Sequence, residues 1–246
     1  GMSSRKTALV TGAAARLGAC TATTLHERGC DVLLHCNSSV EQAARLADEL
    51  NARRENSACV AQADLSVPAG IESLVAAFRE RFGRLDILVN NASRFYPTRI
   101  GETLAWQWDD LVNSNLRGPY FLVQALLPEL QTAGGSIVNI VDIHAERPMA
   151  NHGVYSISKA GLAMMTRAMA AELGPAVRVN GVSPGAILWA VNEEDDSARQ
   201  SILDRTVMKR TGEASDIASA VAYLALDAPY VTGQILAVDG GRSLNM

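Results

Sequence analysis

Several features that often point directly to a function are scarce or missing in this sequence of 246 residues. No apolar run reaches the ~18 residues of a membrane-spanning helix, and the first residues lack the apolar core of a signal peptide. Acidic residues outnumber basic ones, and the net charge of −4 argues against a surface that binds nucleic-acid phosphates. Only 5% of the residues are aromatic, too few for base-stacking platforms. We therefore expect a cytoplasmic protein that binds neither nucleic acid nor membrane.

Cysteine is also sparse. The four cysteines lie in the first quarter of the chain, without a Cys-x-x-Cys pair and without histidines at metal-ligand spacing. We expect reduced thiols and no metal site. Gly1, which precedes Met2, is interpreted as a remnant of cloning, and residues 1–5 are expected to be flexible.

Short apolar runs alternate with amphipathic stretches along the chain. The runs typical of buried strands are 7–11, 31–36, 58–62, 85–90, 136–141, 177–182 and 235–238. The helices expected between them include 17–28, a stripe of Ile71, Leu74, Val75 and Phe78, a region 104–130 that Pro119 and Pro128 bend, and 154–173. This alternation predicts an α/β fold with a single doubly wound (Rossmann-type) parallel sheet flanked by helices. Residues 1–246 would form one dinucleotide-binding catalytic domain, with its ligands at the carboxyl ends of the strands.

A glycine-containing turn follows the first predicted strand. Residues 11–18 read Thr-Gly-Ala-Ala-Ala-Arg-Leu-Gly, with Gly12 and Gly18 at the turn and at the helix that it opens. Such a turn lets the backbone approach a ligand closely, and a pyrophosphate would lie on the helix N-terminus. Arg16 and Leu17 lie in this turn, and the Arg16 guanidinium can reach a phosphate or an anionic substrate. A plain strand-to-helix turn without a ligand is the alternative.

The second predicted strand ends without an acid. NAD sites usually place an acid there, on the ribose 2′-hydroxyl, but this sequence reads His35-Cys36-Asn37-Ser38. Because an acid would repel a 2′-phosphate, its absence permits NADP. His35, Asn37 and Ser38 can donate hydrogen bonds to such a phosphate, although the cation of a strong NADP site is missing. We therefore expect NADPH as the cofactor, with a moderate preference over NADH.

Tyr155 and Lys159 are spaced i, i+4, on one face of a predicted helix. Asp142 follows the predicted strand 136–141, so Asp142 and Tyr155 can face one another across a strand end. The charge of Lys159 can lower the pKa of the phenol, and its ammonium group can hold a cofactor ribose. A surface helix with an unrelated Tyr and Lys is the alternative.

Taken together, these motifs make the sequence similar to the short-chain dehydrogenase/reductase family over essentially its full length. The motifs are Thr11-Gly12…Gly18, Asp64-Leu65, Asn-Asn-Ala-Ser at 90–93, Asn115, Tyr155…Lys159, Pro184-Gly185 and Asp-Gly-Gly at 239–241. The resemblance implies that Tyr155 is the proton donor, that Lys159 assists it and that Asn115 supports a water chain. It also implies that Asp64 and Leu65 flank the adenine, and that Asn91, Ala92, Pro184 and Gly185 belong to the cofactor site.

Two departures from the family pattern make the chain resemble the pteridine reductase branch. Asp142 stands where the family usually has Ser, and Asn-Asn-Ala-Ser replaces Asn-Asn-Ala-Gly. Arg16 in the turn, the run Ser-Arg-Phe-Tyr-Pro at 93–97 and the stretch 50–66 add to this resemblance. It implies that Phe95 stacks on a pterin, and that Arg16 and Ser93 contact pterin and cofactor phosphate. A core position is the alternative for Phe95.

The charge of Asp142 indicates the substrate. An ionised carboxylate only accepts hydrogen bonds, so it would repel a ketone oxygen and the alkoxide formed from it. It should also disfavour a tyrosinate at Tyr155, because two anions would share a site. Asp142 therefore suits a substrate with N–H donors that needs a proton on a ring nitrogen, as a pterin or folate does.

Two other functions remain open. One is an NADP-dependent ketone or 3-oxoacyl reductase on the same scaffold, in which Asp142 is a tolerated substitution. The other is a non-catalytic NADP-binding sensor. Trp189 follows the Pro184-Gly185 motif and lies either in a lid over the substrate or in an exposed acidic loop. Because similar proteins are commonly tetramers, we expect a homotetramer.

Overall fold

The structure is a computed structural model that describes residues 4–185 and 196–246. In this part of the chain, seven parallel strands form one sheet in the order β3-β2-β1-β4-β5-β6-β7. The strands are β1 (Thr7–Val10), β2 (Asp31–Cys36), β3 (Ala58–Gln62), β4 (Ile87–Asn90), β5 (Ser136–Ile140), β6 (Arg178–Pro184) and β7 (Ile235–Val238). The order reverses between β1 and β4, which is the switch point of a doubly wound fold. The predicted fold class is confirmed.

The sheet separates two apolar cores because side chains alternate between its faces. Within β1, Leu9 belongs to one core, whereas Ala8 and Val10 belong to the other. In β2, Leu33 likewise lies in the first core and Leu34 in the second. Every residue of β1, β2, β4 and β5 is buried, as expected of a parallel sheet covered on both faces.

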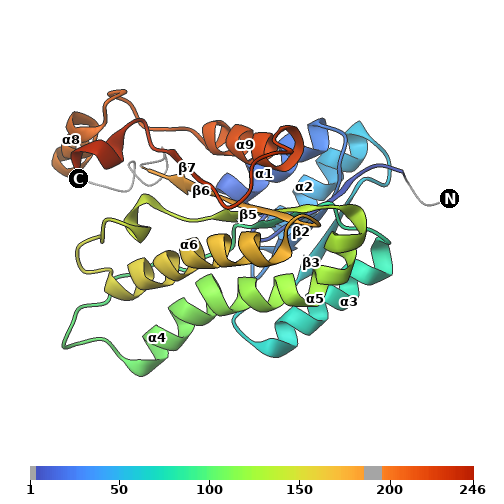
Figure 1. The fold of residues 1–246 in the computed structure, drawn as a ribbon, viewed down its shortest axis with the longest axis horizontal. Coiled ribbons are helices and arrows are strands. Elements are labelled where there is room, and N and C mark those ends of the chain that lie inside the picture. The colour runs from blue at the N-terminus through green and yellow to red at the C-terminus, as the bar shows by residue number, and fades with distance from the viewer. Residues whose placement is uncertain (1–3, 186–195) are drawn as a thin grey trace.

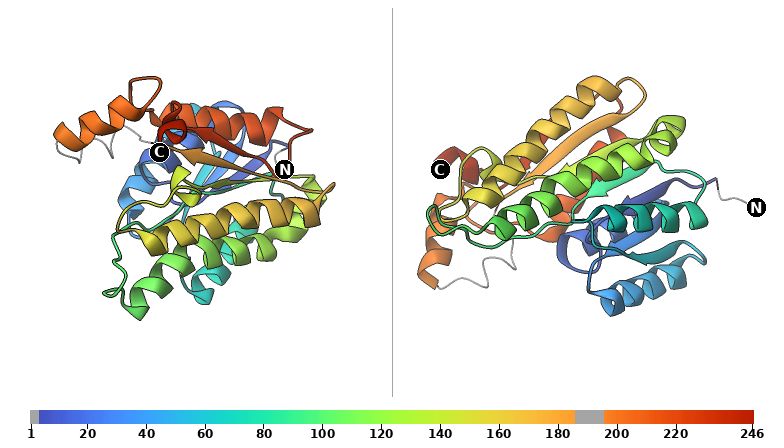
Figure 2. Two further views of the ribbon diagram at one scale, coloured as in Figure 1. Left: turned by 60° about the vertical axis from the view of Figure 1, so that its left-hand side comes forward. Right: turned by 90° about the horizontal axis from the view of Figure 1, so that it is seen from below.

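Helices cover both faces of the sheet (Figure 1). One face is covered by α1 (Arg16–Glu27), α2 (Val40–Arg53) and α9 (Ala214–Ala222), and the other by α3 (Pro68–Arg81), α5 (Gly118–Ala133) and α6 (Gly153–Leu173). Figure 2 shows α4 (Ala105–Val112) and α5 running beside α6. The helix α8 (Asp196–Arg205) buries none of its residues and lies near the C-terminus (Figures 1 and 2).

The long predicted helix 104–130 is divided. Between α4 and α5 the chain forms a π-helical turn, Asn113–Arg117, so the irregularity comes just before Pro119 rather than at it. Pro119 lies in the first turn of α5, directly after the π-helical turn. Pro128 lies inside α5, which ends at the left-handed residue Gly134.

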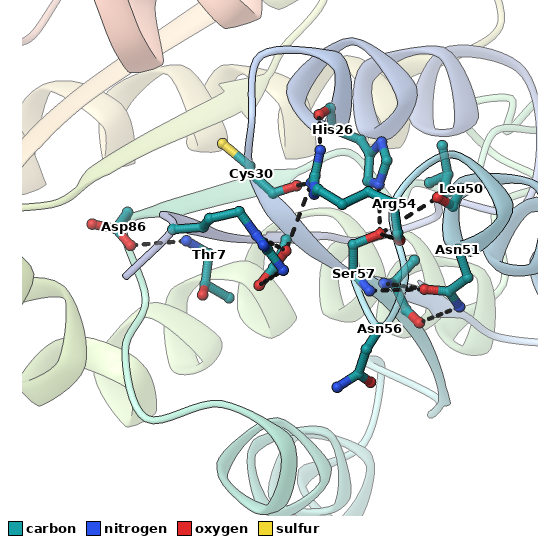
Figure 3. Close-up of polar contacts among 12 residues, drawn as sticks. Thr7, His26, Cys30, Leu50, Asn51, Arg54, Asn56, Ser57 and Asp86 are labelled. Atoms are coloured by element: carbon teal, nitrogen blue, oxygen red, sulfur yellow. Dashed lines mark hydrogen bonds and ion pairs between the residues drawn. The ribbon is translucent and has the colours of Figure 1, made fainter. Parts of the chain in front are cut away.

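A polar cluster lies at the amino ends of the strands (Figure 3). His26 Nε2 is 2.7 Å from Ser57 Oγ, and Asn51 Oδ1 accepts the N–H groups of Ser57 and Ala58 where β3 begins. Asp86 similarly accepts the N–H of Thr7 at the start of β1 (2.9 Å). The contacts of Asn51 and Asp86 satisfy backbone N–H groups that would otherwise be buried without partners. The whole cluster lies at the end of the sheet opposite to the predicted site.

None of the helices in the ranges 4–185 and 196–246 combines the length and apolar character needed to cross a membrane. All four cysteines are unpaired; Cys30 and Cys36 are buried, and Cys20 and Cys59 are half-buried. Burial raises the pKa of the Cys30 and Cys59 thiols to about 11, which keeps them protonated and unreactive.

Candidate active site

A cavity of about 370 Å³ opens at the carboxyl ends of the central strands. Its lining includes nine residues of the predicted site: Gly12, Arg16, Leu17, His35, Asn37, Leu65, Asn91, Ala92 and Ser93. They come from the carboxyl end of β2 and from the segments that follow β1, β2, β3 and β4, including the start of α1, and these flank the switch point of the sheet. This is where a doubly wound fold binds its ligand.

The glycine turn allows the close approach that a dinucleotide requires. Gly12 has φ +61°, and a Cβ there would lie 2.9 Å from the Cα of Ala92. A Cβ on Gly18 would lie 1.9 Å from the carbonyl oxygen of Gly12, so only glycine permits this packing of α1. Ala15 places no side-chain cap on the first turn of α1, which favours an anion at this helix N-terminus. The residues of the turn fit a bound pyrophosphate.

Arg16 adopts a left-handed backbone with φ +56°. This conformation is unfavourable for most residues other than glycine. The exposed side chain of Arg16 lines the cavity. Strain of this kind is often found at ligand-binding sites.

His35 differs from its prediction. The ring is buried, its Nδ1 accepts the N–H of Gly12 (3.0 Å), and its Nε2 donates to the carbonyl of Ala63 (2.8 Å). Both nitrogens are thus engaged within the protein, and His35 has no free N–H for a 2′-phosphate. Burial lowers its pKa, which keeps the ring neutral in this tautomer. His35 instead ties the glycine turn to the end of β3.

Of the other predicted cofactor residues, some line the cavity and some do not. Ser38 is exposed and is not part of the lining. Asn91 donates from Nδ2 to the carbonyls of Thr11 and Gly12, so its amide supports the turn. Pro184 ends β6, and Gly185 lies so close to Asp239 that a Cβ would be 2.7 Å from the Asp239 Cβ.

The structure brings Asp142, Tyr155 and Lys159 together. Tyr155 Oη donates to Asp142 Oδ2 over 2.7 Å, while Asp142 Oδ1 accepts the N–H of His144 over 2.8 Å. The Lys159 ammonium donates to the carbonyl of Ile140 at the end of β5 (3.0 Å) and lies 5.9 Å from the centre of the Tyr155 ring. Asp142 is half-buried, and the other two side chains are buried.

Electrostatics keep the phenol protonated. Burial raises the pKa of Tyr155 well above its usual value, and the charge of Asp142 and the hydrogen bond to it add to the shift. The raised pKa agrees with the expectation that a tyrosinate next to the Asp142 carboxylate is disfavoured. The charge of Lys159 alone would have lowered the pKa of Tyr155. Burial lowers the pKa of Lys159 to about 8, against the opposing effect of Asp142. Lys159 therefore gives up its charge at a lower pH than an exposed lysine would.

Asn115 lies in the π-helical turn and is fully buried. Its Oδ1 accepts the N–H of Arg94 (2.8 Å), and its Nδ2 donates to the carbonyl of Arg94 (2.9 Å) and to Ser158 Oγ (3.1 Å). Ser158 Oγ donates in turn to the carbonyl of Tyr155 (2.7 Å). The side chain of Asn115 thus joins the loop after β4 to the helix that carries Tyr155, and its amide has no hydrogen left for a water.

Phe95 is not a core residue, because 53% of it is exposed. Its ring stacks on His152 at a centroid distance of 4.7 Å and an angle of 12°, and it meets Tyr155 edge-on at 4.9 Å. No sequence pattern points to His152, because a stacking partner just before a helix has no characteristic spacing. Ala15, Ala63, Ser66, Arg94 and Ser114 also line the cavity without having been predicted. Trp189 lies outside the described residues.

Comparison with known proteins places this geometry in a family. A family model described as enoyl-(acyl carrier protein) reductase matches residues 12–243. The chain is 38% identical to pteridine reductase 1 of Leishmania tarentolae, over 96% of each protein. It is 36% identical to the granaticin polyketide synthase putative ketoacyl reductase 2 of Streptomyces violaceoruber, again over 96% of each. It is 32% identical to a 3-oxoacyl-(acyl-carrier-protein) reductase of Staphylococcus epidermidis, over 96% of this chain and 98% of that one.

The sheet order and these matches identify an oxidoreductase of the kind that uses a nicotinamide dinucleotide. The chain belongs to the short-chain dehydrogenase/reductase family.

Proposed function

We propose that this chain is an NADPH-dependent pteridine reductase. It would reduce a pterin, a dihydropterin or dihydrofolate by hydride transfer to a C=N carbon and protonation of the ring nitrogen. The observation that carries the proposal is the hydrogen bond from Tyr155 Oη to the carboxylate of Asp142. The 38% identity to a pteridine reductase supports it.

The carboxylate selects the substrate by its charge. Asp142 uses one lone pair on each oxygen for Tyr155 and His144, and it retains further lone pairs for N–H donors. The amino group and ring nitrogens of a pterin supply such donors. A ketone or thioester carbonyl offers only lone pairs, and the carboxylate repels both the carbonyl and the alkoxide formed from it.

Tyr155 and Asp142 handle the proton. The raised pKa of Tyr155 keeps its hydroxyl protonated at neutral pH, so a proton is available for the ring nitrogen. The phenolate left behind recovers its proton from solvent, and Asp142, which is hydrogen-bonded to the phenol oxygen, is placed to relay that proton. Lys159 stabilises the phenolate during the interval through its charge.

The chain's own residues fit the cofactor. Gly12, Gly18 and the first turn of α1 would hold the pyrophosphate, and Lys159 the nicotinamide ribose. Asn37 lines the cavity where an acid would select NAD, which supports NADPH. When bound, NADPH supplies the hydride.

Phe95 provides a stacking surface beside the phenol. His152 covers one face of its ring, so a planar substrate would stack on the other face, within reach of Tyr155. Arg16 after β1 and Ser93 after β4 both line the cavity and would contact both pterin and cofactor phosphate.

We also propose a homotetramer, which light scattering on the purified protein would test.

The test measures NADPH oxidation with dihydrobiopterin, dihydrofolate and an acetoacetyl thioester as substrates, and NADH as the control cofactor. We expect turnover of one or both pteridines, slower turnover with NADH, and none of the thioester. Turnover of the thioester without that of a pteridine would identify a 3-oxoacyl reductase instead. Tight NADPH binding without oxidation by any substrate would identify a non-catalytic sensor.

A further inference from the structure

Arg94 joins two loops that the sheet keeps apart. It follows β4, and its side chain lines the cavity. One guanidinium nitrogen pairs with Asp110 of α4, and the other lies 3.2 Å from Asp64 Oδ1 after β3. Because β2 and β1 lie between β3 and β4, this single side chain spans the edge of the cavity.

Each carboxylate that Arg94 contacts is itself held in place. Asp64 Oδ1 accepts the N–H and the hydroxyl of Ser66 (2.9 and 2.6 Å). The Ser66 hydroxyl is the main cause that lowers the pKa of Asp64, and the charge of Arg94 adds to it. Asp110 Oδ2 accepts the hydroxyl of Tyr96 over 2.7 Å. Burial and this carboxylate raise the pKa of Tyr96 to about 12, so its hydroxyl remains a donor.

The backbone of Arg94 is fixed as firmly as its side chain. The Asn115 amide binds both its N–H and its carbonyl, and it leads through Ser158 to the carbonyl of Tyr155. Phe95 is the next residue along the chain. A change in the position of Arg94 is therefore passed both to the cavity wall and to the ring beside the phenol.

We propose that Arg94 is a positioning residue, whose guanidinium fixes Asp64, beside the cavity-lining residues Leu65 and Ser66, and the loop that carries Phe95, and so links cofactor binding to substrate placement. This inference rests on the proposed function. In this role the Arg94 guanidinium does not touch the reacting atoms. Its pair with Asp64 acts on the affinity for the dinucleotide. Its pair with Asp110, which also binds Tyr96, acts on the loop that carries Phe95.

The experiment compares Arg94→Met with Arg99→Met, which removes an exposed arginine from the same loop. NADPH affinity is measured by calorimetry without substrate, and KM and kcat are measured with dihydrobiopterin. We expect Arg94→Met to weaken NADPH binding about tenfold, within the range of coupling between sites, and to raise KM more than it lowers kcat. Arg99→Met should leave the affinity and KM unchanged.

Variants that remove one of the two contacts at a time separate the two effects. Asp64→Asn should weaken NADPH binding with little change in the pteridine KM, whereas Tyr96→Phe should raise that KM with little change in NADPH affinity. Arg94→Lys keeps the charge but loses the fork that reaches two carboxylates, so it should restore only part of the affinity. If Arg94→Met does not fold, these three variants decide the question.

Two results would overturn the inference. One is an NADPH affinity of Arg94→Met that matches that of Arg99→Met. The other is that Asp64→Asn and Tyr96→Phe leave both the NADPH affinity and the pteridine KM unchanged. The calorimetric measurement needs no pteridine. If the protein reduced no pteridine at all, the proposed function would fail. The role of the contact between Arg94 and Asp64 would still be decided by the NADPH affinity.

Discussion

Replacing Asp142 by Ser restores the residue usual in the family and removes the charge on which the proposed chemistry depends. Two of the three causes that raise the pKa of Tyr155 are the charge of Asp142 and the hydrogen bond to it, and only burial remains in the variant. The phenol pKa should therefore fall toward its usual value. The N–H donors of a pteridine would also lose their acceptor.

The size of the effect follows from the acid–base assistance that is lost. Such assistance is worth roughly 10²–10⁴ in rate, or about 2.7–5.5 kcal/mol in the barrier. We expect kcat/KM for dihydrobiopterin to fall by that range. Losing a charge-assisted hydrogen bond to a buried tyrosine should also destabilise the protein by about 1.5–3 kcal/mol.

The assay combines steady-state NADPH oxidation, ultraviolet difference titration of the phenol and chemical denaturation. Asp142→Asn is the matched variant, because it keeps the size of the side chain and an acceptor oxygen but not the charge. Both variants should lose pteridine turnover, and both should ionise Tyr155 at lower pH than the parent. Undiminished turnover by Asp142→Ser would refute the role assigned to the carboxylate.

Four further predictions concern the cofactor side of the site. His35→Asn keeps an acceptor near the N–H of Gly12, whereas His35→Gln keeps a donor near the Ala63 carbonyl. Because Gly12 belongs to the turn that would hold the pyrophosphate, calorimetry should find NADPH bound more tightly by the Asn variant. Because burial lowers the pKa of His35, the folded state binds fewer protons than the unfolded state, so the stability of the protein should fall as the pH drops below about 6.5. Chemical denaturation of His35→Asn should show a smaller decline over the same pH range. A decline equal to that of the parent protein would contradict this role. Gly18→Ala should abolish NADPH binding and lower Tm, since its Cβ would lie 1.9 Å from a carbonyl oxygen, while Gly153→Ala, whose Cβ meets nothing within 4 Å, should do neither. NADPH affinity should weaken as the pH rises through about 8, where Lys159 loses its charge. Because the charge of Asp142 raises the pKa of Lys159, Asp142→Asn should move the midpoint of this loss of affinity to lower pH. A midpoint that stays in place would show that Asp142 does not act on Lys159.

The sequence predicts the sheet well because its strands are apolar runs with an unambiguous pattern. The ranges 31–36, 58–62 and 235–238 are the observed bounds of β2, β3 and β7. The loop residues follow as well, because residues after parallel strands meet at one edge of the sheet. This is how Asp142 and Tyr155 could be expected to face one another, and the 2.7 Å contact confirms that they do.

Side-chain partners were harder to predict than positions. His35 was expected to donate outward because it ends β2, but its burial and the nearby N–H of Gly12 turn both nitrogens inward. Arg94 was seen only as part of a motif, since its carboxylate partners lie 30 and 16 residues away in the chain. The π-helical turn before Pro119 carries no periodicity of its own, so only a bend could be expected there.

That turn holds an extra residue without rotating α5. A π-helical turn closes one full turn with one residue more than an α-helical turn does, so the helix after it continues in the phase of the helix before it. Deleting one residue between Asn113 and Arg117 would therefore leave an ordinary α-helical turn, with Leu122, Leu126 and Leu130 still facing the core that they now fill. A lineage descended from this chain could lose a residue here and keep the apolar stripe of α5, but Asn115 would lose the setting from which it joins the loop after β4 to α6.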